Sequence, residues 1–260
     1  MLGMFRKNRR ARVIAVANQK GGVGKTTTTI NMGAAMAESD MRILVVDLDP
    51  QANATTGLGI SNRGPQASIY EVLAQQTTVG EVICTTEVPN LEVVPSSQSL
   101  AGAEIELATA LAREHRLERA LETVVDEYDV ILIDCPPALG LLTINALVVA
   151  AEVLVPIQCE YYALEGLAQL VSNVDLVRAS LNPDLEVSTI VLVMYDARTN
   201  LSQTVAEEVR TVFGDKVCRQ VIPRSVRLSE APSLGQPITV LDPTCRGAVA
   251  YRQLAKEVLR

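Results

Sequence analysis

Short apolar runs alternate along this chain with longer segments in which apolar positions recur at helical spacing. Runs such as 130–133 are apolar throughout, which is typical of strands covered on both faces of a parallel sheet. Predicted strands occupy 13–18, 43–47, 91–94, 129–134, 153–157, 187–194 and 217–222, and predicted helices occupy about 26–38, 69–75, 100–126, 141–149, 162–180, 201–213, 226–231 and 244–259. This alternation predicts an α/β fold with a single doubly wound, mainly parallel sheet flanked by helices.

Composition places the chain among globular proteins. Of its 260 residues, 48% are apolar and 20% are charged, which is outside the range of disordered chains. We expect one domain over 13–260, preceded by a basic and flexible N-terminal arm over 1–12. The basic residues of the arm are Arg6, Lys7, Arg9, Arg10 and Arg12. The arm either stays solvated or adds to contact with DNA or anionic lipid.

Targeting segments, cysteine usage and net charge limit the cellular compartment and the kinds of partner that we expect. No apolar run approaches the roughly 18 to 20 residues that span a bilayer, and no apolar core follows the N-terminal charges as in a secretory signal. The five cysteines are scattered without a CxxC pair, so a reducing cytoplasm fits and no metal cluster is indicated. Because the net charge is −7, any binding of DNA must come from a local basic patch.

A glycine-rich stretch carries the strongest chemical signal. Residues 19–27 read Gln-Lys-Gly-Gly-Val-Gly-Lys-Thr-Thr, between a predicted strand and a predicted helix. The backbone N–H groups of such a loop, and the positive end of the helix, face the phosphate oxygens of a nucleotide. Lys25 is expected to reach the terminal phosphates, and Thr26 to ligate Mg²⁺. The expected nucleotide-binding residues here are Lys20, Gly21, Gly22, Val23, Gly24, Lys25, Thr26 and Thr27.

One position departs from the strict P-loop pattern, which has glycine five residues before Gly24. Gln19 stands there, and Lys20 follows it. Lys20 is at the wrong end of the loop to duplicate Lys25, so we expect it to reach a phosphate bound by a neighbouring subunit. The alternative is a solvated loop lysine that happens to precede two glycines.

Three carboxylates join Lys25 at one edge of the predicted sheet. Asp47, Asp49 and Asp134 lie at or just beyond strand ends, and ligands of such sheets gather outside the carboxyl ends of the strands. Asp134 ends an apolar strand, where a carboxylate is costly without a metal or a hydrogen-bond partner. We expect it in the Mg²⁺ shell, through water. Asp47 either contacts the loop or the metal shell, or caps local N–H groups.

Four motifs in the same order resemble the ParA/Soj branch of the deviant-Walker ATPases, a group that includes MinD. Besides the glycine loop, they are 43–53 (Ile-Leu-Val-Val-Asp-Leu-Asp-Pro-Gln-Ala-Asn), 130–137 (Val-Ile-Leu-Ile-Asp-Cys-Pro-Pro), and the region from 196–200 (Asp-Ala-Arg-Thr-Asn) to 222–232. The resemblance implies a partition ATPase whose ATP- and Mg²⁺-bound homodimer binds double-stranded DNA without sequence preference. A ParB-like partner would stimulate its weak intrinsic hydrolysis of ATP to ADP and phosphate, and thereby release it.

The resemblance also implies roles for single residues. Lys20 would contact the partner's phosphates in an ATP-sandwiched dimer, and Asp49 would position or activate the attacking water. Lys20, Lys25 and Asp49 are therefore the expected catalytic group. The family binds adenine with the loop after the seventh strand, where Pro223 would meet the base edge. Ser225 is expected in that site too, although many relatives have Asn at this position and Ser is shorter.

A basic segment near the C-terminal end carries the local positive charge. Its basic residues are Arg198, Arg210, Lys216, Arg219, Arg224 and Arg227. Composition alone favours a salt-bridged helix surface, because acidic residues are interspersed. In Soj-like proteins, however, arginines at the positions of Arg198 and Arg227 bind the DNA backbone. The resemblance therefore implies DNA contacts at Arg198, Arg224 and Arg227, and association with the nucleoid.

Three other classes compete with this interpretation. A MinD-like membrane-cycling regulator needs an amphipathic membrane helix, but 251–260 is short and lacks bulky aromatic anchors. A nitrogenase-reductase-like electron carrier needs cysteines that hold an iron–sulfur cluster between subunits; 95–100 offers none, and Cys135 alone is insufficient. A ParA relative that positions some other cargo on the nucleoid stays open.

Overall fold

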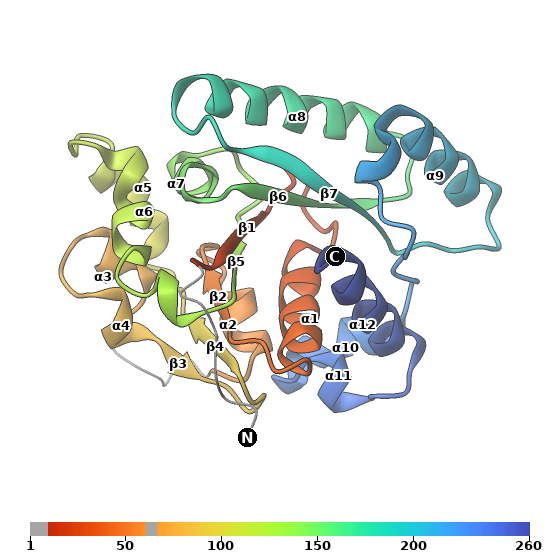
Figure 1. Ribbon diagram of the computed structural model, residues 1–260, viewed down its shortest axis with the longest axis horizontal. Coiled ribbons are helices and arrows are strands. Elements are labelled where there is room, and N and C mark those ends of the chain that lie inside the picture. Colours follow the sequence, from red (N-terminus) through yellow and green to blue (C-terminus); the bar gives the residue numbers. More distant parts are fainter. Residues whose placement is uncertain (1–9, 61–66) are drawn as a thin grey trace.

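The computed structural model describes residues 10–60 and 67–260 and contains one seven-stranded sheet (Figure 1). The strand order is β3-β4-β2-β5-β1-β6-β7, and only β3 runs antiparallel to its neighbour. The strands are β1 (Arg12–Val16), β2 (Ile43–Asp47), β3 (Cys84–Thr85), β4 (Leu91–Val94), β5 (Val130–Asp134), β6 (Glu152–Gln158) and β7 (Glu186–Val193). The prediction of a doubly wound, mainly parallel α/β sheet is confirmed.

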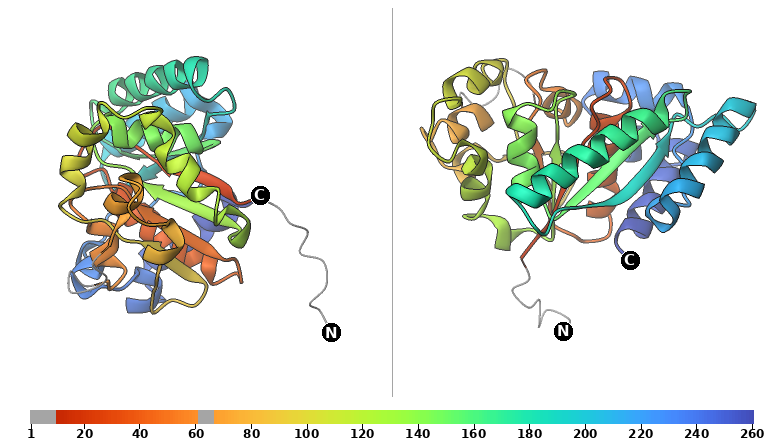
Figure 2. Two further views of the ribbon diagram at one scale, coloured as in Figure 1. Left: turned by 90° about the vertical axis from the view of Figure 1, so that its left-hand side faces the viewer. Right: turned by 90° about the horizontal axis from the view of Figure 1, so that it is seen from above.

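Helices cover both faces of the sheet, as the two turned views show (Figure 2). One layer contains α1 (Lys25–Ala37), α2 (Asn53–Gly57), α10 (Val226–Glu230), α11 (Ile238–Leu241) and α12 (Arg246–Val258). The other contains α3 (Ile69–Leu73), α4 (Val79–Val82), α5 (Leu100–Leu107), α6 (Arg116–Leu121), α7 (Leu141–Val149), α8 (Ala163–Ser180) and α9 (Asn200–Phe213). Each layer buries its own apolar cluster against the sheet, because strands such as β5 present buried residues to both sides.

The prediction of one helix over 100–126 is wrong. The chain breaks between α5 and α6, where Ala112 has a left-handed φ of 49°. Leu111, which helical spacing places on the same face as Leu107, is 90% exposed. After the break, Leu117 and Leu121 of α6 are buried in the same core cluster as Leu107 of α5.

The prediction of a strand over 217–222 is also wrong. This segment follows the free edge of β7 but makes only one isolated bridge, Val217 with Ile190, and a second bridge, Pro223 with Tyr195, lies just beyond it. Backbone N–H groups of Cys218 and Ile222 donate to β7 carbonyls at 2.9 and 2.8 Å. The segment thus shields the edge of the sheet without completing a ladder, and it leads from η3 (Gly214–Lys216) toward α10.

Only the end of the expected N-terminal arm, from residue 10 onward, belongs to the described residues. The basic residues of the expected arm up to Arg9 lie outside the described residues. Arg12 belongs to β1, where its guanidinium pairs with Glu152 at 2.9 Å and donates to the carbonyl of Val258 at 3.0 Å. In the described part of the chain, no helix is long and apolar enough to cross a membrane.

Candidate functional site

The carboxyl ends of three central strands meet at one edge of the sheet. Asp134, the last residue of β5, lies in register with Val16 of β1 on one side and with Asp47 of β2 on the other. The glycine loop leaves β1 at this edge and enters α1. The predicted convergence of Lys25, Asp47 and Asp134 is therefore a consequence of strand register.

The loop has a backbone that only glycine adopts without strain. Gly22 and Gly24 have φ of 74° and 76°, and Gly24 is the N-cap of α1. Asn18 fixes the start of the loop: its side chain accepts the Lys20 N–H at 3.0 Å and donates to the carbonyl of Pro156 at 2.8 Å. The first N–H groups of α1 have no partner within the helix. The loop therefore presents donors to an anion at the positive end of α1.

Lys25 is held inside the site rather than in solvent. Its residue is 7% exposed, and its ammonium donates to the carbonyl of Lys20 at 3.3 Å. Burial lowers the pKa of Lys25, and the nearby Asp134 and Asp49 charges act in the opposite direction. A buried ammonium has three donors to satisfy, so a phosphate oxygen at this position would stabilise it.

Asp134 is fully buried and accepts hydrogen bonds from two hydroxyls of α1. Thr26 Oγ1 donates at 2.7 Å and Thr29 Oγ1 at 3.2 Å. Burial and the adjacent Asp47 raise the pKa of Asp134 well above the ordinary range of a carboxyl. Such an acid gains from a cation that offsets its charge, and Thr26 places a hydroxyl ligand beside it. This pair fits Mg²⁺ held by a hydroxyl and, through water, by a carboxylate.

No cluster of three or more His, Cys, Asp or Glu side chains that could hold a metal ion occurs in 10–60 or 67–260. Mg²⁺ usually keeps several waters and takes only one or two carboxylates together with substrate phosphates. The Thr26 and Asp134 donor set therefore suits Mg²⁺ that arrives with a nucleotide better than a resident all-protein metal cage.

Asp47 and Asp49 have different surroundings although one residue separates them. Asp47 is fully buried and accepts the N–H and hydroxyl of Thr55 at 2.8 and 2.7 Å, and the N–H of Asp49 at 3.2 Å. Burial raises its pKa, against the lowering effect of the Thr55 hydrogen bonds. Asp49 is also buried, at 8% exposure, and accepts the N–H of Gln51 at 2.9 Å. Asp47 thus caps local donors, whereas within 10–60 and 67–260 only one oxygen of Asp49 accepts a hydrogen bond.

Lys20 does not face the same surroundings as Lys25. Its ammonium lies 2.5 Å from Glu160 Oε2, and the two side chains are 48% and 44% exposed. Beyond Glu160, Tyr161 and Tyr162 are exposed and stack edge to face with ring centroids 5.2 Å apart. Sequence reasoning missed these three residues. Their signal was an acid and two aromatic residues directly after the end of β6.

A cavity of about 140 Å³ opens beside the glycine loop. Its walls include Gly24, Thr27, Met194, Ile222, Pro223, Arg224, Ser225 and Tyr251. The predicted adenine loop and the predicted phosphate loop therefore share one cavity. Sequence reasoning missed Met194 and Tyr251; the hydroxyl of Tyr251 lies 3.3 Å from Thr28 Oγ1, which ties α12 to α1.

The three arginines expected to contact DNA lie in loops and short helices after β7. Arg198 is 88% exposed and forms a bidentate pair with Asp196 at 2.9 and 2.8 Å. Arg227 in α10 pairs with Glu230 at 3.4 Å. Arg224 is exposed at the mouth of the loop cavity. Two of these cations thus have intrachain carboxylates, as the salt-bridged alternative requires, yet all three stay accessible to solvent.

Proteins that close a phosphate loop with one lysine and open it with another form the deviant Walker class of P-loop ATPases, and the fold and the loop place this chain in that class. The profile of a family described as an AAA domain matches residues 11–187. The chain is 56% identical over 247 residues to sporulation initiation inhibitor protein Soj of Bacillus subtilis (strain 168), covering 95% of this chain and 98% of that relative.

Two further comparisons agree with this class. The chain is 51% identical over 250 residues to chromosome partitioning protein ParA of Caulobacter vibrioides (strain NA1000 / CB15N), covering 95% of this chain and 94% of that relative. A solved structure of cobyrinic acid a,c-diamide synthase from Mycobacterium smegmatis, with bound ATP analog and magnesium, is 38% identical with a TM-score of 0.85, covering 96% of this chain and 95% of that one. The chain belongs to the ParA/Soj family of chromosome-partitioning ATPases. The predicted family and the predicted ATPase class are confirmed.

Proposed function

We propose that this chain is a DNA-partitioning ATPase whose ATP- and Mg²⁺-bound form is a homodimer. The observation that carries the proposal is the different setting of the two loop lysines. Lys25 is buried beside the acids of its own site, whereas the exposed ammonium of Lys20 is directed to Glu160. Lys20 is therefore available to the phosphates of a nucleotide held by a second copy, and the charge of that nucleotide would hold two lysine-bearing loops together.

The residues of the site divide the work of phosphoryl transfer. Bound Mg²⁺ supplies charge neutralisation for the phosphates. The loop N–H groups and Lys25 would hold the phosphates, Thr26 and Asp134 would hold the metal shell, and Asp49 would orient the attacking water. Pro223 and Ser225 line the cavity that would take the adenine. Hydrolysis to ADP and phosphate removes the charge that joins the two loops, so it would end the dimer.

Binding to double-stranded DNA would use Arg198, Arg224 and Arg227 without base readout. Doubling these cations in a dimer raises the number of phosphates neutralised, and affinity from counterion release rises steeply with that number. A ParB-like partner would stimulate hydrolysis and release the protein from the nucleoid. The relatives named chromosome partitioning proteins support this function over a MinD-like membrane cycle. A different cargo on the nucleoid is the second candidate, since the same site would serve it.

The test compares the full chain with Lys20→Ala by sedimentation velocity, with Mg²⁺ and a non-hydrolysable ATP analogue. We expect the wild-type chain to dimerise and Lys20→Ala to bind the analogue as a monomer. A normal dimer of the variant would overturn the role of Lys20 across the interface. In the same buffer, Arg227→Glu should dimerise but lose salt-sensitive binding to duplex DNA. Addition of a ParB-like protein from the same genome should then raise the hydrolysis rate of the wild type.

A further inference from the structure

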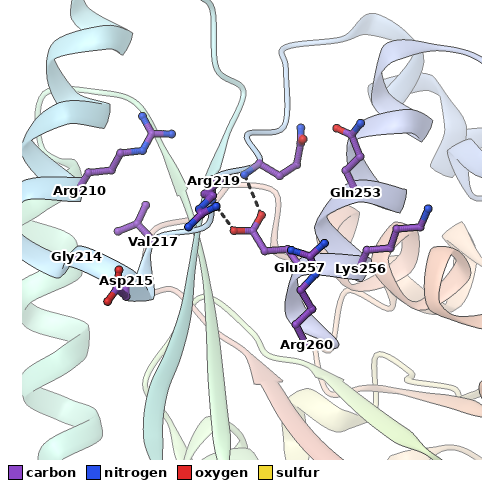
Figure 3. Close-up of a pocket in the computed structure, with 10 residues that line it drawn as sticks. Arg210, Gly214, Asp215, Val217, Arg219, Gln253, Lys256, Glu257 and Arg260 are labelled. Atoms are coloured by element: carbon purple, nitrogen blue, oxygen red, sulfur yellow. Dashed lines mark hydrogen bonds between the residues drawn. The ribbon is translucent and has the colours of Figure 1, made fainter.

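A groove of about 920 Å³ lies away from the nucleotide cavity, between the C-terminal halves of α9 and α12 (Figure 3). Its floor is the segment after η3 that follows the free edge of β7. Three separate parts of the chain supply basic side chains to it: Arg210 from α9, Arg219 from the floor, and Lys256 and Arg260 from the α12 end. On a chain with a net charge of −7, this is a local concentration of positive charge.

In the part of the chain that the structure describes, three cations of the groove have no ion-pair partner, although Asp215 and Glu257 also line it. Among the described residues, no carboxylate lies at ion-pairing distance from Arg210, Arg219 or Lys256. The Glu257 carboxylate instead accepts the backbone N–H of Arg219 at 2.7 Å and of Gln220 at 3.0 Å, as Figure 3 shows. The remaining acid that lines the groove, Asp215, is exposed. Arg198 and Arg227, in contrast, each have an acidic partner.

The form of the groove indicates the kind of anion. Its basic side chains are all exposed, and none of its polar side chains is fully buried, so it lacks the enclosed donors that would hold one small phosphate. Val217 is the only apolar side chain among the residues that line it. An acidic peptide usually needs apolar anchors as well as charge. The lining has no aromatic residue either, which removes the stacking that single-stranded nucleic acid requires.

We propose that this groove binds the phosphate backbone of duplex DNA, as a second contact surface separate from Arg198, Arg224 and Arg227. Phosphate contacts need only cations and amide donors at suitable positions, and Gln253 and Gln220 add amides beside the basic side chains. The inference rests on the proposed function, because it assumes that the protein binds DNA. It assigns a further stretch of the DNA backbone, beyond the part bound by the three arginines, to the groove. Within the described ranges, the basic side chains that would bind it there form no ion pair with a carboxylate.

The test measures binding of the full chain, with Mg²⁺ and a non-hydrolysable ATP analogue, to a random-sequence duplex over a series of salt concentrations. The variant is Arg210→Ala/Lys256→Ala. Every DNA phosphate that is no longer neutralised should lower the slope of log K against log salt by about 0.9. The matched control is Lys216→Ala, which removes an exposed cation of η3 that does not line the groove. Arg210→Lys/Lys256→Arg keeps the charges and should keep the wild-type slope.

The result expected is a shallower salt slope and weaker binding for the alanine pair, with dimerisation and thermal unfolding unchanged. A wild-type slope for the alanine pair, together with loss of binding in Arg227→Glu, would overturn the groove and leave the proposed function standing. Failure of the wild-type dimer to bind duplex DNA would overturn both. A polyglutamate peptide is the competing ligand: if the alanine pair loses binding to the peptide but not to DNA, the groove is a peptide site and the inference is wrong.

Discussion

The ammonium of Lys20 lies 2.5 Å from the carboxylate of Glu160 in the same chain. We propose that Lys20 contacts the nucleotide of a second copy. In its own chain it already forms an ion pair with a carboxylate. If the ammonium must leave Glu160 to reach the phosphates of a second copy, as we propose, the carboxylate and the phosphates compete for it. The ion pair is exposed, and exposed pairs contribute about 0–1 kcal/mol. An ion pair of this strength would yield to a bound triphosphate, and its loss would still be measurable.

Glu160→Gln should favour the ATP-dependent dimer. Removal of the carboxylate frees the Lys20 ammonium while keeping the shape of the side chain, so the dimer should form at a protein concentration lower by about two- to fivefold, the equivalent of up to about 1 kcal/mol. Sedimentation with a non-hydrolysable ATP analogue measures this directly. Glu122→Gln, an exposed acid elsewhere, is the control. An unchanged or weaker dimer would show that Glu160 does not compete for Lys20.

Asp134→Asn should stabilise the empty protein, and more so at alkaline pH. Burial raises the pKa of Asp134 in the folded state, so above the ordinary carboxyl pKa the folded chain binds more protons than the unfolded chain. Stability is therefore lost as pH rises toward the raised folded value. The variant removes this loss, so its free energy of unfolding should exceed that of the wild type near pH 8 by more than it does near pH 5.

Urea unfolding at pH 5 and pH 8 without nucleotide checks the Asp134 prediction, with the exposed Asp184→Asn as control. Mg²⁺ and ATP should stabilise the wild type more than the variant, because the ionised carboxylate gains a cation. The hydrolysis rate of the variant should fall sharply. Equal pH dependence in the two proteins would mean that Asp134 is not the acid that destabilises the empty site.

Asp49→Ala and Asp47→Ala should separate catalysis from folding. Asp47 accepts three hydrogen bonds in the core, and its loss leaves the buried Thr55 N–H without an acceptor, a cost of about 1–3 kcal/mol. Asp49→Ala should unfold close to the wild type, dimerise with ATP and stay on DNA, with hydrolysis reduced by about 10²-fold or more, as for loss of a group that activates water. Phosphate release and denaturant melts measure the two effects. Rapid hydrolysis by Asp49→Ala would remove it from the mechanism.

Gly22→Ala should damage the loop, while Gly21→Ala should not. Gly22 has a φ of 74°, in the left-handed region where an added Cβ costs about 1–2 kcal/mol. Gly21 does not lie in that region, and a Cβ on it would meet nothing within 4 Å. Nucleotide affinity, measured by fluorescence titration, should fall about tenfold in the first variant, in line with about 1.4 kcal/mol per factor of ten. Similar losses in both variants would point to steric exclusion of the nucleotide instead of backbone strain.

The sheet could be predicted because its central strands are buried on both faces and so have uninterrupted apolar sequences. β3 could not, because two residues do not make a periodic pattern. Residues 217–222 have the composition of a strand, but they meet β7 only at isolated points and form no ladder, which depends on how the two segments lie and not on the sequence of one of them. The helix break at Ala112 depends on which leucines reach the core, and helical spacing alone places Leu111 there as well.

Those residues of the site that lie at the end of a strand could be predicted from the sequence. Asp47 and Asp134 are carboxylates that end apolar runs, and register then brings them together. The partner of Lys20 could not, because Glu160 follows a strand 140 positions away and contacts the loop only through the pairing of β6 with β1. The sequence could not predict Tyr251 in the site for a similar reason, because its contact with Thr28 depends on how α12 packs on α1.

One short backbone segment connects the basic groove with the nucleotide cavity. The segment that carries Arg219 in the basic groove reaches Pro223 and Ser225 in the nucleotide cavity four and six residues later. Hydrogen bonds to β7 hold it in one register between these points. If adenine binds at Pro223 and a duplex at Arg219, as we propose, both ligands contact one backbone segment, and any coupling between them must be reciprocal. If nucleotide strengthens the hold on DNA by some factor, DNA must strengthen the hold on nucleotide by that same factor.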